Sequence, residues 1–267
     1  RARLFDGAGA VFVAAWARPD ASSGVAVAPV GSNPTGSVVG VSTAAMSLDD
    51  NYRLLDADIP VVGQADMDGL RQSPYYPLVR DALMATLSER EQGDLRNVLT
   101  VLDRADHIVV GADPTQEQGV ILMRGSFEPG HLDLLEAPDG QFTHRQHALR
   151  GNSNSRGGVT TDTMILGSTE RVHRALDRLD GLLPATGPTL AGFPEAAGRA
   201  HLGERDVSVV VLLTEEIRRG FGQGDVEQQL QQSGLSAGAS LDARNGIRLS
   251  GFFTASTEGA VQVRSEE

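Results

Sequence analysis

Two histidines three residues apart, His144 and His147, are the residues whose types and spacing come closest to a metal site. An HxxH pair can chelate a metal ion when it lies on a helix. The surrounding residues instead predict a strand or a loop, and residues three apart on a strand point to opposite faces. No carboxylate cluster adjoins the pair in the sequence, so surface histidines are the simpler interpretation. His144 and His147 are kept as the metal candidates, and we expect no cofactor.

Two pairs of aspartates form the second pattern that could do chemistry. Asp56 and Asp58, like Asp66 and Asp68, have the DxD spacing that can bind magnesium or calcium through oxygen atoms. Neither pair continues with the glycine and glutamate of an EF-hand loop. Asp66 and Asp68 are better explained as the N-cap and first-turn residues of a helix, where carboxylates are favourable.

Signatures of nucleophilic catalysis and of phosphate binding are missing from the sequence. There is no G-x-S-x-G elbow, and Gly125-Ser126 and Gly167-Ser168 are single steps beside predicted strands. The glycine-rich stretch 151–158 contains Arg156 but lacks the P-loop ending, so we interpret it as a mobile hairpin tip. A Ser–His–Asp triad assembled from distant residues stays open. The sequence therefore favours a protein that is not an enzyme.

Composition narrows the classes of partner. The 267 residues carry a formal net charge of −12 with a pI near 4.9, which disfavours binding to nucleic acid or to an anionic membrane surface. All 23 basic residues are arginine, and there is no cysteine, which removes disulfides and thiolate chemistry. No apolar run approaches the roughly 18 residues needed to cross a bilayer, so we expect no transmembrane segment.

Part of the chain occurs twice. The segment 58–66 precedes a charged helical stretch, as does 206–214, and 119–127 has a counterpart in 245–253. The same order of two matched segments predicts a duplicated strand–helix–hairpin unit.

These patterns predict an α+β fold: a duplicated β-α-β-β unit with a mainly antiparallel sheet and helices packed on one side. We expect an Ala/Gly/Val-rich segment at 1–45, holding a strand plus a loop, and a first repeat at 46–182. A Pro/Gly linker at 183–204 leads to a second, incomplete repeat at 205–267. The strand at 11–17 is a candidate for completing the second repeat.

Two segments together carry a resemblance to known proteins. One is Ile59–Leu70, a strand followed by Asp-x-Asp-x-Leu-Arg. The other is Met164-Ile165-Leu166-Gly167-Ser168, followed by Val172 and Ala175-Leu176. The second resembles the "LGS…V..AL" pattern of uncharacterised exported or lipoprotein-type families of GC-rich bacteria. The resemblance implies a repeated strand–helix–hairpin unit and export, and it brings no catalytic residues with it.

Three functional hypotheses follow. The first is a non-enzymatic binding or scaffold protein of the bacterial cell envelope, with the cytoplasm as the alternative compartment. The second is a metal-assisted or serine hydrolase that uses His144, His147 or a dispersed triad. The third is an accessory subunit of a larger assembly, in which a protein partner or a second copy completes the second repeat.

Overall fold

The structure, a computed structural model, describes residues 50–86, 89–134, 140–220, 234–244 and 246–256. Its strands are β1 Val61–Asp66, β2 Ala105–Asp113, β3 Gln118–Gly125, β4 Gly140–His144, β5 His147–Gly151, β6 Ser155–Val159, β7 Thr163–Ser168, β8 Val207–Leu212, β9 Gly234–Asp242 and β10 Arg248–Ala255. Its helices are η1 Asp50–Leu54, α2 Met67–Gln72, α3 Tyr76–Thr86, α4 Glu89–Leu102, α5 His131–Leu134, α6 Thr169–Leu179, α7 Phe193–Arg199 and α8 Glu215–Arg219. The predicted strand at 11–17 lies outside the described residues.

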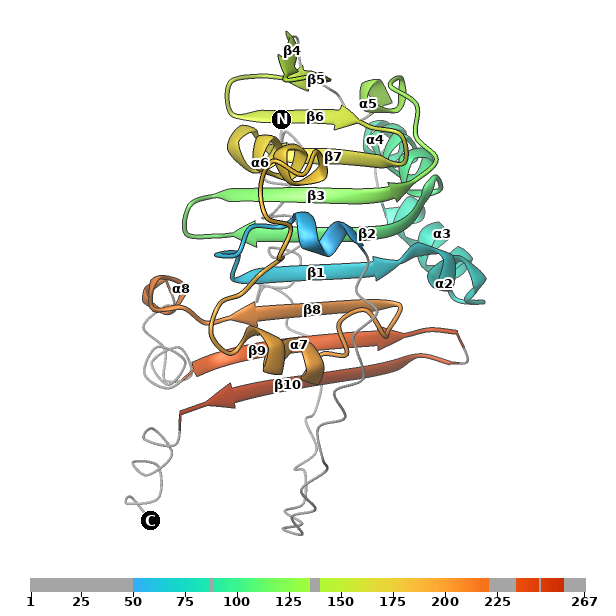
Figure 1. Cartoon of the computed structure of the whole chain (residues 1–267). Helices are drawn as coiled ribbons and strands as arrows, with labels where there is room; N and C mark the ends of the chain where they lie inside the picture. Colours follow the sequence, from blue (N-terminus) through green and yellow to red (C-terminus); the bar gives the residue numbers. More distant parts are fainter. Residues whose placement is uncertain (1–49, 87–88, 135–139, 221–233, 245, 257–267) are drawn as a thin grey trace, which may run out of the picture.

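All ten strands form one antiparallel sheet in the order β10-β9-β8-β1-β2-β3-β7-β6-β5-β4 (Figure 1). The α+β class and the mainly antiparallel sheet predicted from the sequence are confirmed. The first strands of the two repeats, β1 and β8, pair with each other, and Gly63 lies opposite Val209. On one side β2 and β3 follow β1, and on the other side β9 and β10 follow β8. The two matched halves are therefore arranged about a local two-fold axis between β1 and β8.

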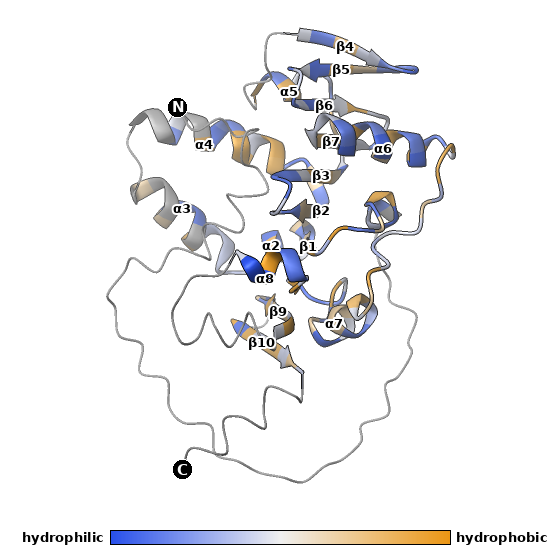
Figure 2. Ribbon diagram, turned by 90° about the vertical axis from the view of Figure 1, so that its left-hand side faces the viewer, coloured by the Kyte–Doolittle hydropathy of each residue, from blue (hydrophilic) through white to orange (hydrophobic). Residues whose placement is uncertain are grey.

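Helices cover both faces of the sheet, whereas the sequence suggested one face only. Adjacent residues of β7 show why, because Ile165 belongs to one buried cluster and Met164 to the other. Alternate residues of a strand point to opposite faces, so each face builds a separate core. One core joins η1, α6 and α7 to the sheet, and the other joins α2, α4 and α5. Figure 2 shows α3 and α4 on one side and α6 and α7 on the other.

A local sequence signal explains where helix α2 begins. Asp66 caps α2, as predicted, by accepting a hydrogen bond from the Gly69 N–H at 3.0 Å.

The segment 183–204, predicted as a linker, contains α7, whose Ala196 and Ala197 are buried in the core with Phe193. None of the helices in the described part of the chain is long and apolar enough to cross a membrane.

Candidate functional site

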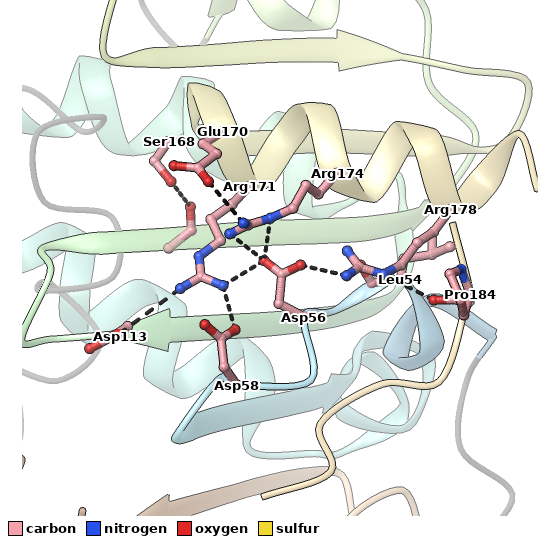
Figure 3. Close-up of polar contacts among 11 residues, drawn as sticks. Leu54, Asp56, Asp58, Asp113, Ser168, Glu170, Arg171, Arg174, Arg178 and Pro184 are labelled. Atoms are coloured by element: carbon pink, nitrogen blue, oxygen red, sulfur yellow. Dashed lines mark hydrogen bonds and ion pairs between the residues drawn. The ribbon is translucent and has the colours of Figure 1, made fainter. Parts of the chain in front are cut away.

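A cluster of charged side chains lies where α6 packs on the sheet beside η1. Three arginines of α6 point toward Asp56 (Figure 3). Arg171 Nη1 donates to Asp56 Oδ2 at 2.6 Å, Arg174 Nη2 lies 3.0 Å from the same oxygen, and Arg178 Nη2 lies 2.6 Å from Asp56 Oδ1. Arg171 Nη1 also donates to Asp58 Oδ1 at 2.7 Å. The first DxD pair thus binds arginine.

The charged groups of this cluster form an ion-pair network. Burial raises the pKa of the Asp58 carboxyl, but the hydrogen bond and positive charge of Arg171 outweigh burial and hold it below its ordinary value. Burial likewise lowers the pKa of Arg171, and its bonds to Asp58 and Asp56 raise it overall. Arg171 is only 2% exposed. Carboxylates paired with arginine in this way have little capacity left for a divalent cation.

The second DxD pair is also occupied by an arginine. Arg244 Nη2 donates to Asp66 Oδ2 at 2.5 Å, and its Nε donates to Asp206 Oδ1 at 2.7 Å. The other oxygen of Asp206, which is buried, accepts the Ala243 N–H at 2.8 Å. Asp68 pairs with Arg71 one turn further along α2. The Asp66 side chain thus has two uses, the α2 cap and a bridge between the two repeats.

His144 and His147 flank the turn of the β4–β5 hairpin, where they are direct cross-strand partners. Directly opposed residues of an antiparallel pair share a face, so the expectation that they point apart is wrong. Each binds a different carboxylate at the C-terminal end of α6. His144 Nε2 lies 2.9 Å from Asp177 Oδ1 in the helix, and His147 Nε2 lies 3.0 Å from Oδ1 of Asp180, the C-cap residue. The two pairs hold the hairpin on the C-terminal end of α6.

A third histidine, His173 of α6, stacks on His144 with the ring centroids 4.0 Å apart. Its Nε2 lies 3.0 Å from Arg156 Nη1 of β6, whose guanidinium covers the Phe142 ring. Burial lowers the pKa of His173, and the charges of His144 and Arg156 lower it further, against the opposing effect of Asp177. The neutral form of His173 accepts a hydrogen bond from Arg156, which the protonated form is unable to do.

These histidines and aspartates do not assemble a metal site in the described ranges. Within residues 50–256, apart from the short undescribed gaps, no group of three His, Asp or Glu side chains has the geometry to hold a metal ion. Ser168 is the N-cap residue of α6, and its hydroxyl donates to the Gly119 carbonyl at 3.3 Å. The glycine-rich stretch 151–158, predicted to be a mobile tip, includes most of strand β6. Just before β6, Asn152 Oδ1 accepts a hydrogen bond from the Ser155 N–H at 2.9 Å.

A groove lies at the other end of the sheet, and the sequence analysis did not predict it. It has a volume of about 670 Å³ and lies between α7 and the ends of β8, β9 and β10. Its apolar lining comes from Leu190, Leu212, Leu213, Leu235 and Phe253. Leu235 is 50% exposed and Phe253 is 48% exposed, so unlike core residues they are accessible to a ligand.

The rim of this groove carries one ion pair. Arg199 Nη2 lies 2.8 Å from Glu195 Oε1 across one turn of α7, and both side chains are about half exposed or more. Exposed pairs of this kind contribute less than about 1 kcal/mol, so either partner can turn to a ligand at little cost. The groove therefore combines exposed apolar surface with available charged groups, in contrast to the α6 cluster.

Of the comparisons with known proteins, the one with solved structures found similar chains. No family model matches the chain, and no curated protein matches it. "Structure of crystal form IV of TP0453" is similar at a TM-score of 0.50 and 12% identity, covering 74% of this chain and 76% of that chain. "Structure of crystal form III of TP0453" is similar at a TM-score of 0.46 and 11% identity, covering 72% and 74%. At 12% identity, the likeness to crystal form IV concerns the fold alone.

Proposed function

We propose that this chain is a non-enzymatic binding protein whose ligand occupies the groove between α7 and strands β8–β10. The observation that carries the proposal is the contrast between two regions. The polar residues of the α6 cluster and the β4–β5 hairpin are held by one another. The groove instead presents Leu235 and Phe253 half exposed beside the Glu195–Arg199 pair. Concave apolar surface with a few polar groups at its edge is typical of ligand sites.

The ligand class that fits this lining is a small apolar or amphipathic molecule. Its apolar part would cover the leucines of β8 and β9, and a polar end would reach the ion pair of α7. Burial of apolar ligand surface at about 25 cal/mol per Å² supplies the affinity. The ion pair fixes the orientation more than it adds affinity.

A dye titration with matched variants tests the groove. We expect the purified protein to enhance the fluorescence of an apolar probe such as Nile red, with a single saturable site. Leu235→Arg should weaken binding by roughly tenfold or more, equivalent to ~1.4 kcal/mol, because it places a charge on the groove wall. Leu78→Arg is the control, since Leu78 is 65% exposed on α3, away from the groove.

The same titration distinguishes this proposal from the hydrolase hypothesis. His144→Ala should leave dye binding unchanged, because His144 lies on β4 and does not line the groove. Equal binding by the wild type and Leu235→Arg would contradict the groove as the site. Labelling by a fluorophosphonate, or activity lost in His144→Ala, would support hydrolytic chemistry instead.

The compartment is part of the proposal. We assign the protein to the bacterial cell envelope on the resemblance carried by the "LGS" segment, which the structure places at the end of β7, and by Val172, Ala175 and Leu176 of α6. Those three helix residues are buried in the core. Fractionation of the source cells, followed by immunoblotting, should place the protein in the envelope fraction. Its recovery with cytoplasmic markers would refute this part of the proposal.

A further inference from the structure

Strand β10 forms one end of the sheet, and its outer edge has no partner strand among the residues that the structure describes (Figure 1). The strand is eight residues long, contains no proline, and carries a single charge, on Arg248. Exposed edges normally carry prolines and charged residues because they prevent pairing with other chains. The β10 edge is therefore suited to accept another strand.

The internal symmetry shows what this edge lacks. β10 occupies the position in the second repeat that β3 occupies in the first. The outer edge of β3 is covered by β7, in a register that runs from Val120 opposite Gly167 to Arg124 opposite Thr163. In the described part of the second repeat, no strand plays the role of β7. A further strand would complete the second repeat in the way that β7 completes the first.

The side chains of β10 are arranged symmetrically about Gly251. Leu249 is 70% exposed and Phe253 is 48% exposed, and both share one face with Gly251 because alternate residues of a strand do. A Cβ added to Gly251 would meet only the Gly238 carbonyl oxygen within 4 Å, at 3.5 Å, so the space above this glycine is open. An antiparallel copy of the same strand with Gly251 opposite Gly251 would place each Leu249 opposite the Phe253 of the second copy.

Charge complementarity favours the same register. In it, Arg248 of the second copy stands opposite Thr254, and directly opposed residues share a face. Thr254 lines the groove together with Glu195, whose side chain is 70% exposed. The arginine of each copy would therefore enter the mouth of the other copy's groove on the side of that carboxylate.

From these observations we infer that two copies of this chain associate edge to edge along β10, antiparallel, with Gly251 on the two-fold axis. The pairing joins two ten-stranded sheets into one and brings each Leu249 into contact with the Phe253 of the other copy. It also brings the two grooves close to one interface. The net charge of −12 on each copy opposes association, so added salt should tighten the dimer.

A single cysteine tests the register, because the natural chain has none. Directly opposed residues of an antiparallel pair have Cα atoms about 4.5 or 5.5 Å apart, within the roughly 4.4–6.8 Å range that a disulfide spans. We expect Gly251→Cys to form a disulfide-linked dimer under mild oxidation. Leu78→Cys, on exposed α3, is the control for random collision. A yield of cross-linked Gly251→Cys no higher than that of Leu78→Cys would overturn the inference.

Sedimentation velocity on the full chain supplies an independent measurement. The wild type should dimerise with increasing concentration, Leu249→Arg should raise the dimer Kd by roughly tenfold, ~1.4 kcal/mol, and Leu78→Arg should leave it unchanged. Leu249 does not line the groove, so Leu249→Arg should bind Nile red like the wild type. Failure of the dimer is thus distinguishable from failure of the proposed function.

Two outcomes would assign the edge to a different occupant and overturn the pairing of copies. One is a wild type that stays monomeric at its highest soluble concentration, while deletion of residues 1–45 produces a dimer. The other is a monomeric wild type that binds a different protein, with Leu249→Arg abolishing that complex.

Discussion

At the scale of single residues, the guanidinium of Arg171 makes contacts that a lysine side chain is unable to make. Nη1 of Arg171 contacts both Asp56 and Asp58, while Nη2 lies 4.0 Å from Asp113. The planar guanidinium can face several carboxylates at once, whereas an ammonium group is a single point charge. No sequence pattern pairs residue 171 with residue 56. Only the folded arrangement of η1 and α6 reveals the network.

We expect Arg171→Leu to lower the free energy of unfolding by about 1 to 3 kcal/mol, because it removes one of the three arginines that contact the buried Asp56 carboxylate. Chemical denaturation at neutral pH measures the change. Arg199→Leu, which removes an exposed pair with Glu195, should cost less than about 1 kcal/mol. A loss of similar size in both variants would contradict the structural role assigned to Arg171.

His173 should make the stability sensitive to mild acid. Its pKa in the folded protein lies below its ordinary value near 6.5 because of burial, His144 and Arg156, so the unfolded chain takes up the proton at a higher pH. The contribution of His173 is therefore fully present above about pH 6.5 and is lost as the pH falls toward the lowered pKa. The carboxylate of Asp177 faces the same rings and reduces the effect.

Denaturation of the wild type and His173→Gln between neutral pH and mild acid measures this contribution. The stability difference between the two proteins should shrink as the pH falls, because only the wild type carries the titrating ring. Parallel curves for the wild type and His173→Gln would refute the assignment.

At the scale of elements, the sequence repeat predicted the strands well. The matched segments 58–66 and 206–214 contain β1 and β8, and the second pair of segments, 119–127 and 245–253, overlaps most of β3 and β10. Strand periodicity and an order repeated twice are properties of the local sequence, so they can be read without coordinates. How the two units meet is a tertiary property, and the β1–β8 pairing was accordingly missed.

Two local errors have identifiable causes. Gly192 and Pro194 were interpreted as linker residues, yet they form the start of α7, where Gly192 has φ 82° and proline is favoured in the first turn. The β4–β5 hairpin turns through Arg145 at φ 53°, a conformation uncommon for arginine that the sequence does not signal. This turn is what makes His144 and His147 cross-strand partners.

The junction of β7 and α6 depends on a glycine. Gly167 has φ 151°, and a Cβ there would lie 2.2 Å from the Gly119 carbonyl oxygen of β3. Gly167→Ala should therefore destabilise the fold by roughly 1 to 3 kcal/mol, since backbone strain adds to the clash. Gly93→Ala, in α4 with nothing within 4 Å, should stabilise it by up to about 1 kcal/mol through helix propensity. Thermal denaturation compares the two, and a stabilising Gly167→Ala would contradict the assigned geometry.

At the scale of the whole molecule, the continuous sheet should make the two repeats unfold together. β1 and β8 pair over five residues at the junction, and the core beside α6 and α7 includes residues of both repeats, such as Val62 and Val210. Pulsed hydrogen exchange with mass spectrometry through a urea titration should give one midpoint for peptides of β2 and β9. A clearly lower midpoint for β9 would show that the second repeat unfolds by itself.

The β1–β8 pair also has a consequence for synthesis on the ribosome. About 140 residues separate the end of β1 from the start of β8. At a translation rate of about 5–20 residues per second, the unpaired edge of β1 is exposed for roughly 7 to 28 s before its partner is made. During that interval the nascent chain presents an open strand edge in a crowded cell. The order of the strands therefore leaves this edge available to other chains until β8 emerges.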